Sequence, residues 1–239
     1  GGGVSSVSKA VVIGPPSVEG ADLDYTFAQV AVDEPVVDYS SNCGNLSSAV
    51  GPFAVDEGLV KVEDGEVLIR IHNTNTSKII HSRFQVKDGI AITGGEQTIP
   101  GVSGSGAAIR LDFLDPGGAT TGGLLPTGNV IDTLDLPGFG PVEVSMVDAA
   151  NGCIFVDAYA VGLKGTEQPE EMEGNKQAMA ALDTIRRHAA VAMGLSAKPE
   201  DTPLANPKIA IIAKPADYTT ISNEKVAAEQ IDLVARMLS

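Results

Sequence analysis

The chain has 239 residues, 43% of them hydrophobic, which is enough to bury a sizeable core in one large domain or two modest ones. Its 31 acidic and 16 basic residues give a formal net charge of −15, which repels phosphate backbones and anionic lipid and argues against nucleic acid and membranes as partners. Because no apolar run approaches the roughly 18 to 20 residues of a membrane span, we expect a soluble globular protein.

Two cysteines, Cys43 and Cys153, are too few for a disulfide framework and predict reduced thiols in a cytoplasmic protein. No secretory segment opens the chain, but Gly1, Gly2 and Gly3 are not a typical natural start, so targeting stays open. The oligomeric state also stays open, and a homo-oligomer is compatible with the sequence.

Short β-branched runs separated by Gly, Pro and Asp dominate the first two thirds of the chain and predict strands. The 27 glycines and 14 prolines support a β-rich chain with many tight turns. The predicted strands cover residues 9–14, 24–32, 67–75, 107–114 and 141–148.

One helix is predicted among these strands, over residues 45–57. Few charges interrupt its apolar surface before Asp56, as expected for a helix enclosed by sheet. Pro52 inside it predicts a kink or a short first segment. The apolar positions at helical spacing are Leu46, Val50, Phe53 and Ala54.

A turn-rich passage at 115–129 is predicted to be a linker or a ligand-binding loop. We place a boundary after it, between an N-terminal lobe of residues 1–133 and a C-terminal lobe of residues 134–239. The second lobe is predicted to contain helices at 175–195, with Asn175 as the N-cap, and at 225–238. The order of elements suggests an α/β protein of two related lobes.

Cys43 lies between Asn42 and Gly44, where the helix at 45–57 is predicted to begin. Unpaired backbone N–H groups and the helix dipole at such a position favour a thiolate and lower the pKa of the thiol. The alternative is a small buried hydrophobic residue, because free cysteines are among the most buried residue types. Local sequence leaves both readings open.

Lys9 follows a segment of serines and glycines and starts an apolar strand. Hydroxyl and backbone N–H groups of that segment suit a carboxylate, with Lys9 as an additional cation, and a lysine of lowered pKa also serves as a base. The alternative is a solvated lysine beside a flexible terminus. Taken alone, Lys9 fits the solvated reading better.

Other chemistry finds little support in the sequence. Cys153, at the head of an apolar strand, is better read as a packing residue. The three histidines have no partner at metal-ligand spacing, so no metal is predicted. Phosphate-binding glycine motifs and a serine nucleophile motif are absent.

Nine fragments of the chain occur in an order that is familiar as a set: "SSVSKAVVIGPP", "DYTFAQV", "DYSSNCGNLSSAVGPFAVDEG", "IHNTNTSKII", "LLPTGNVID", "DAANGCIFV", "GTE", "RRHAAVAMGL" and "PKIAIIAKPADY". Together, over nearly the whole chain, they resemble the PrpF-like family of 2-methylaconitate cis-trans isomerases, 3-methylitaconate Δ-isomerases, 4-oxalomesaconate tautomerases and aconitate isomerases. The resemblance implies an α+β, diaminopimelate-epimerase-like fold, in which two lobes each wrap a β-barrel-like sheet around a central helix.

The resemblance also implies that Lys9 and Cys43 are a catalytic pair that moves a proton along an unsaturated di- or tricarboxylate without a cofactor. We leave open which of the two is the base and which is the acid. Members of the family usually begin earlier and continue further, so the second lobe is expected to be incomplete. The substrate-binding residues expected around the pair are Ser5, Ser6, Ser8, Asn42, Gly44 and Asn45.

Two other functions remain as alternatives. One is an amino-acid racemase or epimerase on the same fold, whose two-thiol mechanism requires a second cysteine at a helix cap. Cys153, expected before a strand, is a poor candidate for that second thiol. The other is a non-catalytic protein that binds a polycarboxylate or assists a partner enzyme.

Overall fold

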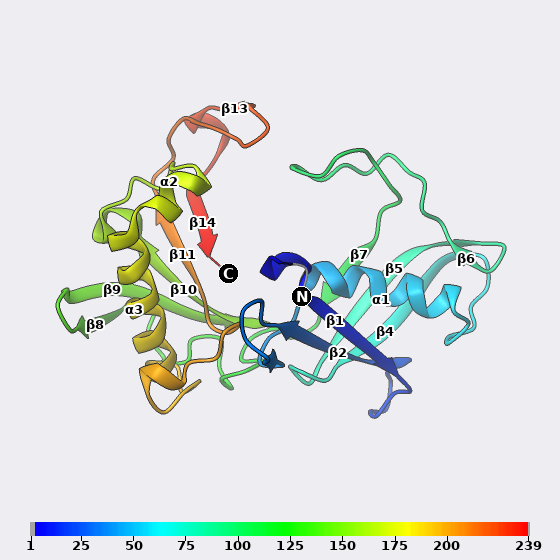
Figure 1. Ribbon diagram of the computed structural model, residues 1–239. Coiled ribbons are helices and arrows are strands. Elements are labelled where there is room, and N and C mark those ends of the chain that lie inside the picture. The colour runs from blue at the N-terminus through cyan, green and yellow to red at the C-terminus, as the bar shows by residue number, and fades with distance from the viewer. Residues whose placement is uncertain (1–2, 239) are drawn as a thin grey trace. The chain divides into compact units, whose positions relative to one another are not determined.

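The computed structural model describes residues 3–238, which form two compact units divided between Pro116 and Gly117. Figure 1 shows a sheet and one longer helix in each unit. The division falls earlier than the expected boundary after residue 133. The reason is that the turn-rich segment belongs to the second unit: Gly118 N–H donates to Asp148 O, and Asp148 N–H donates to Leu124 O. Gly1 and Gly2, part of the glycine and serine segment expected to bind carboxylates, lie outside the described residues.

The first unit is built on a seven-stranded sheet in which the main path runs β1-β2-β4-β5-β6. Among the described residues this path does not close into a barrel, because β1 and β6 remain at its two ends. Neighbours pair antiparallel except β2 and β4, which are parallel. The strands are β1 (Lys9–Gly14), β2 (Leu23–Val30), β3 (Val37–Asp38), β4 (Gly65–Asn73), β5 (Lys78–Lys87), β6 (Ile90–Ala91) and β7 (Arg110–Phe113).

Helix α1 (Gly44–Asp56) packs against this sheet and continues through Pro52. Gly51 allows the close approach, because a Cβ there would lie 2.7 Å from Ser82 Oγ and 2.8 Å from Phe84 Cε1 on β5. The buried side of the helix joins a core that includes Tyr25, Phe27, Ile69, Ile71 and Ile80. The opposite side is less covered than an enclosed helix requires, since Phe53 is 49% exposed.

The second unit contains a five-stranded sheet in the order β14-β11-β10-β9-β8 and a separate pair, β12 and β13. Its single parallel pairing in the larger sheet joins β10 to β11. The strands are β8 (Asp132–Leu136), β9 (Gly140–Ala149), β10 (Asn151–Asp157), β11 (Lys208–Ala213), β12 (Tyr218–Thr219), β13 (Lys225–Val226) and β14 (Val234–Leu238).

Helix α3 (Lys176–Ala192) packs on the larger sheet of the second unit, preceded by α2 (Pro169–Gly174). The predicted N-cap of α3 is confirmed, since Asn175 Oδ1 accepts a hydrogen bond from Ala178 N–H at 3.1 Å. Single 3-10 turns complete the chain at Ser5–Val7, Ala158–Val161, Pro199–Asp201 and Ala228–Gln230.

The prediction of a helix over residues 225–238 is wrong. The segment forms β13, a 3-10 turn and β14, and β14 pairs antiparallel with β11. Val234 and Leu238 are four positions apart, a spacing that places two side chains on one face of a helix and also on one face of a strand. The segment forms a strand because β11 offers an edge to pair with, and this pairing satisfies backbone N–H and C=O groups of both strands.

Candidate active site

Lys9 and Cys43 lie together in the first unit. Lys9 Nζ is 3.6 Å from Cys43 Sγ, although the two residues are 34 positions apart in the chain. Lys9 is the first residue of β1, and Cys43 is the N-cap of α1. The helix therefore presents its first turn to the start of the edge strand, and the amine and the thiol meet there.

The backbone at Cys43 is extended, with φ −115° and ψ 106°, and its side chain forms no capping hydrogen bond. The thiol is therefore directed to Lys9 rather than used to close the helix. The first N–H groups of an α-helix have no carbonyl partner within the helix and carry partial positive charge. Gly44 and Asn45, which supply two of these groups, are exposed and can reach an anion beside the pair.

The carbonyl group of Cys43 is fixed by three donors. It accepts hydrogen bonds from Ser47 N–H at 3.0 Å, Ser47 Oγ at 2.8 Å and Tyr25 Oη at 3.3 Å. Tyr25 is fully buried, and burial raises the pKa of its hydroxyl to about 12, so it remains a donor at neutral pH. These contacts hold the backbone that carries the thiol.

The serine segment before Lys9 divides into an exposed and a buried part. Ser5 and Ser6 are exposed within the 3-10 turn Ser5–Val7. Ser8 is 2% exposed, and its hydroxyl donates to Val4 O at 2.9 Å. Gln29, opposite Lys9 in the sheet, donates from Nε2 to Ser5 O at 2.9 Å and to Ser8 O at 3.0 Å. The turn is therefore tied to β2 and held in a defined place beside Lys9.

Asn42 lies beneath the turn rather than on its surface, since it is 7% exposed. Its Oδ1 accepts a hydrogen bond from Asn73 Nδ2 at 3.4 Å. Neither Asn73, Gln29 nor Tyr25 was among the residues expected at the site. Asn73 lies in the fragment "IHNTNTSKII", and Tyr25 and Gln29 lie in "DYTFAQV". Both fragments resemble the family, but nothing in them marks these three residues as part of the site.

Cys153 has no corresponding environment. It lies within β10 of the second unit, paired with Val147 on one side and Lys208 on the other. Burial raises the pKa of its thiol to about 11. A strand interior and a protonated thiol do not suit the second cysteine of a two-thiol racemase.

A serine, a histidine and an aspartate also come together in the first unit. His72 Nδ1 lies 3.0 Å from Asp24 Oδ1 and 3.4 Å from Ser17 Oγ. Because both partners contact the same ring nitrogen, the group lacks the arrangement in which the base joins the nucleophile through its other nitrogen. Among the described residues, no cluster of three or more His, Cys, Asp or Glu side chains could hold a metal ion.

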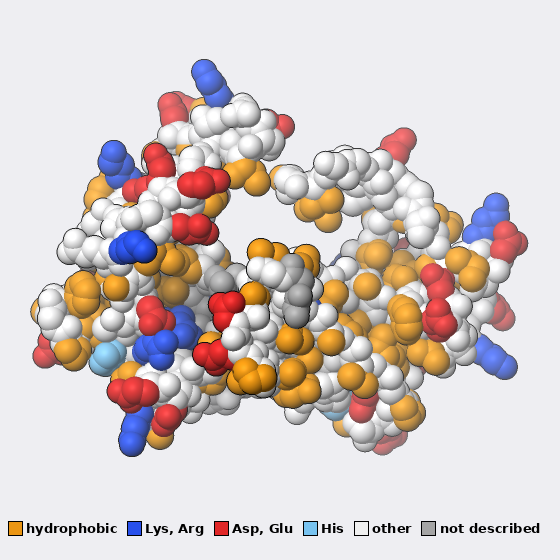
Figure 2. Space-filling view, in the orientation of Figure 1, with side chains coloured by type: hydrophobic (Ala, Val, Ile, Leu, Met, Phe, Trp, Pro, Cys, Tyr) orange, Lys and Arg blue, Asp and Glu red, His pale blue; other side chains and the backbone are white. Residues whose placement is uncertain are grey.

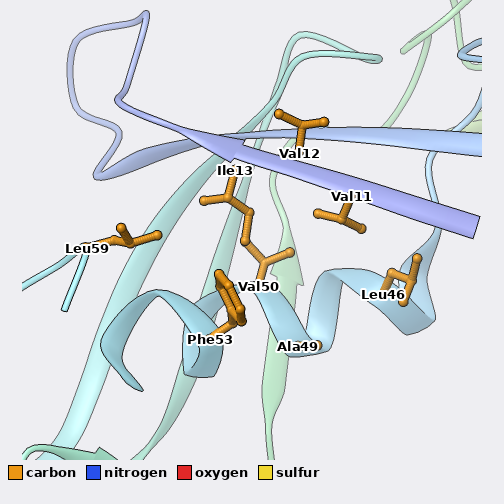
Figure 3. A pocket seen from close by; sticks show the side chains of 8 residues that line it. All are labelled: Val11, Val12, Ile13, Leu46, Ala49, Val50, Phe53 and Leu59. Atoms are coloured by element: carbon orange, nitrogen blue, oxygen red, sulfur yellow. The ribbon is translucent and has the colours of Figure 1, made fainter. Parts of the chain in front are cut away.

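An apolar pocket of about 450 Å³ lies further along the same two elements, between β1 and α1 (Figure 3). Val11 and Ile13 point from β1 toward the helix, and Val12 points away from it. Apolar side chains also gather on the surface over β1 and α1 (Figure 2). A lining without polar side chains offers nothing to a carboxylate, so the pair at the start of the two elements is the better site. The lining residues are Val11, Val12, Ile13, Leu46, Ala49, Val50, Phe53 and Leu59.

The α+β fold is shared with a solved structure described as methylitaconate-delta-isomerase. The two superpose with a TM-score of 0.80 at 43% sequence identity, over 98% of this chain and 62% of that one. The family described as PrpF protein matches residues 1–239. The chain therefore belongs to the PrpF protein family.

Curated relatives agree with this assignment. The chain is 44% identical, over 97% of its length, to 3-methylitaconate isomerase of Eubacterium barkeri. It is 37% identical, over its full length, to 2-methyl-aconitate isomerase of Shewanella oneidensis. It spans 62% of the length of each of these two proteins. Within residues 3–238, no helix has the length and apolar character to cross a membrane.

Proposed function

We propose that the protein is an isomerase of small unsaturated di- or tricarboxylates, of the methylitaconate, methylaconitate or aconitate type. The observation that carries this proposal is the 3.6 Å contact between Lys9 Nζ and Cys43 Sγ at the N-terminus of α1. In this proposal, the amine and the thiol exchange protons with a substrate held by the helix N–H groups that favour an anion. The relatives named as isomerases of such acids support the same reaction class.

The reaction is an allylic proton shift. One member of the pair removes a proton from the carbon next to the double bond, and the electron pair delocalises over three carbons toward a carboxylate. The other member returns a proton at the far carbon, so the double bond moves and no atom is gained or lost. Rotation within the delocalised anion converts cis to trans. The shift requires no redox step or group transfer, and therefore no cofactor.

After one turnover the base holds an additional proton and the acid lacks one. The separation of 3.6 Å between Lys9 Nζ and Cys43 Sγ allows that proton to return directly or through one water molecule. Such a return makes the pair self-restoring. The proposed reaction therefore requires both groups, whichever of them begins as the base.

The exposed groups around the pair are the proposed carboxylate ligands. Ser5 and Ser6 offer hydroxyls from the 3-10 turn, and Gly44 and Asn45 offer N–H groups from the first turn of α1. These donors also stabilise the negative charge that develops on the carboxylate as the proton leaves. The buried Ser8 and Asn42 contribute through the backbone that they hold. Local attraction thus offsets the overall charge of −15.

The experiment is to incubate the protein with methylitaconate, methylaconitate or cis-aconitate in D₂O and follow the vinyl, methyl and methylene protons by NMR. The proposal predicts movement or geometric exchange of the double bond in at least one acid, with deuterium entering at the allylic carbon. Tight binding of these acids without deuterium uptake would favour the non-catalytic alternative.

Free cysteines persist in reducing compartments, so the free thiols of Cys43 and Cys153 support a cytoplasmic location as part of this proposal.

A further inference from the structure

Two asparagines, one at the end of β4 and one just after it, hold the segment leading to Cys43. Asn73 ends β4 directly opposite Tyr25 in the parallel pairing with β2, and Asn75 follows two residues later. Asn73 is fully buried, so each of its polar atoms needs a partner inside the protein. The sequence between 72 and 76 thus supplies two side-chain amides to the underside of the candidate site.

The hydrogen bonds of Asn73 fix the orientation of its amide group. Thr76 N–H, which can only donate, lies 3.0 Å from Asn73 Oδ1, and Thr76 Oγ1 donates to the same oxygen at 2.7 Å. The Nδ2 group must therefore face the other way. There it donates to Asn42 Oδ1 at 3.4 Å and to Asn75 Oδ1 at 3.2 Å.

The side-chain amide of Asn75 forms the two hydrogen bonds with the backbone of Phe27 that a neighbouring strand would otherwise form. Its Nδ2 donates to Phe27 O at 2.9 Å, and its Oδ1 accepts from Phe27 N–H at 2.8 Å. The second hydrogen of Nδ2 goes to Tyr39 O at 2.9 Å. Asn75 therefore links β2 to the segment four residues before Cys43, and Asn73 links β4 to the residue directly before it.

We infer that Asn73 and Asn75 are positioning residues of the proton-transfer pair. They hold the segment of residues 39–42 in place and thereby fix the distance from Cys43 Sγ to Lys9 Nζ. The inference rests on the proposed function only for its effect on turnover. Its structural content is that the amine and the thiol stay in contact because two amides hold the chain between β3 and α1. Helix geometry alone does not fix that distance, since the thiol makes no capping bond.

The test measures the rate at which iodoacetamide alkylates Cys43 as a function of pH, in a Cys153→Ser background. Replacing Lys9 with alanine removes the amine, and the alkylation curve of that variant defines a thiol without its partner. Asn73→Ala is expected to move the curve in the same direction as Lys9→Ala, with a rate change of about threefold to tenfold. In the Lys9→Ala background, the same Asn73 substitution is expected to change the rate less than about twofold, because the contact is already lost.

Two further variants guard against unfolding as the explanation. Thr76→Val keeps the shape of the side chain and removes one hydrogen bond to Asn73 Oδ1, so it is expected to give a smaller shift in the same direction. Asn206→Ala is the matched control: Asn206 is 1% exposed, bonded to Gly152 N–H, and belongs to the second unit. It is expected to lower stability and leave the alkylation curve unchanged.

Turnover supplies the second readout. Asn73→Ala and Asn75→Ala are expected to lower kcat about tenfold or more with a smaller change in KM, because the exposed carboxylate ligands remain in place. Folded Asn73→Ala and Asn75→Ala proteins with wild-type alkylation curves would overturn the inference, even if the wild type isomerises its substrate. If the wild type does not turn over any acid, the proposed function fails while the alkylation result still decides the positioning role.

Discussion

The two units share a plan and differ at the start of their main helices. Each has a largely antiparallel sheet with one parallel pairing and one longer helix packed on it. In the second unit, Asn175 caps α3 with its own side chain and satisfies a helix N–H group. In the first unit, Cys43 occupies the same cap position, but its side chain makes no bond to a helix N–H group and contacts Lys9 instead. The side-chain cap that is absent at Cys43 and present at Asn175 is the difference that leads us to the candidate site.

The largest effect is expected from removing either member of the pair. Lys9→Ala and Cys43→Ala should each lower turnover by about 10²- to 10⁴-fold, the usual contribution of a general acid or base. Steady-state kinetics measures this. The matched variant Asn175→Ala alters the side-chain cap of the other unit and should keep turnover. Wild-type turnover in both Lys9→Ala and Cys43→Ala would show that the pair is not catalytic.

A second prediction concerns the pH dependence of stability in the first unit. Burial raises the pKa of Tyr25 to about 12, above the unfolded value near 10. The folded state therefore binds the proton more tightly than the unfolded state, so this stabilisation is complete below pH 10 and is lost as pH rises to 12. The loss is on the order of 2 kcal/mol.

Denaturant unfolding of the wild type and Tyr25→Phe between pH 9 and 12 checks this. The free energy of unfolding of Tyr25→Phe should decline less steeply over that interval. Cys153→Ser, which removes a largely buried thiol with a raised pKa, provides the corresponding measurement for the second unit. Equal slopes for the wild type and Tyr25→Phe would mean that the hydroxyl on the Cys43 carbonyl is not buried as described.

Substitutions at the two helix N-caps should separate effects on stability from effects on turnover. Asn175→Ala removes a satisfied cap and should cost about 1 kcal/mol of unfolding free energy without loss of turnover. Cys43→Ser introduces a better capping side chain where none bonds at present, and should leave stability unchanged or raise it by about 0.5 kcal/mol while turnover is lost. Thermal unfolding measures both changes. A Cys43→Ser protein that is clearly less stable would show that the thiol already supports the helix.

The smallest effect is expected at the other cysteine. With a pKa of about 11, about one Cys153 thiol in a thousand is ionised at pH 8, so it should resist alkylation. Cys153→Ser should keep turnover within about twofold. Peptide mapping after brief iodoacetamide treatment measures the labelling. Faster labelling of Cys153 than of Cys43 would reverse the contrast between the two thiols.

Local sequence patterns predict much of this fold because the elements concerned have clear periods. The helix expected at 45–57 occurs as Gly44–Asp56, and the strand expected at 9–14 is β1. The last helix fails because the spacing of Val234 and Leu238 fits both periods, and its outcome depends on pairing with the distant β11. Local signals cannot report such a partner.

The candidate site likewise has residues that the sequence identifies and residues that only the fold reveals. Lys9 and Cys43 are expected at the site from the family resemblance, because local sequence leaves Cys43 undecided and favours a solvated Lys9, and the structure brings the two to 3.6 Å. Asn73 and Tyr25 are not recognised as site residues because their role arises from the parallel pairing of β2 and β4, which places two buried polar side chains under the Cys43 turn. Burial and direction of a side chain are consequences of the fold, so a motif alone does not reveal them.

The most direct measurement of the central claim is the stoichiometry of inactivation by iodoacetamide in the Cys153→Ser protein. The account predicts that loss of turnover follows alkylation of Cys43 one for one. It also predicts that a saturating unsaturated tricarboxylate, bound at the start of α1, slows both. Complete alkylation of Cys43 with turnover retained would contradict the proposal that this thiol and Lys9 carry the proton.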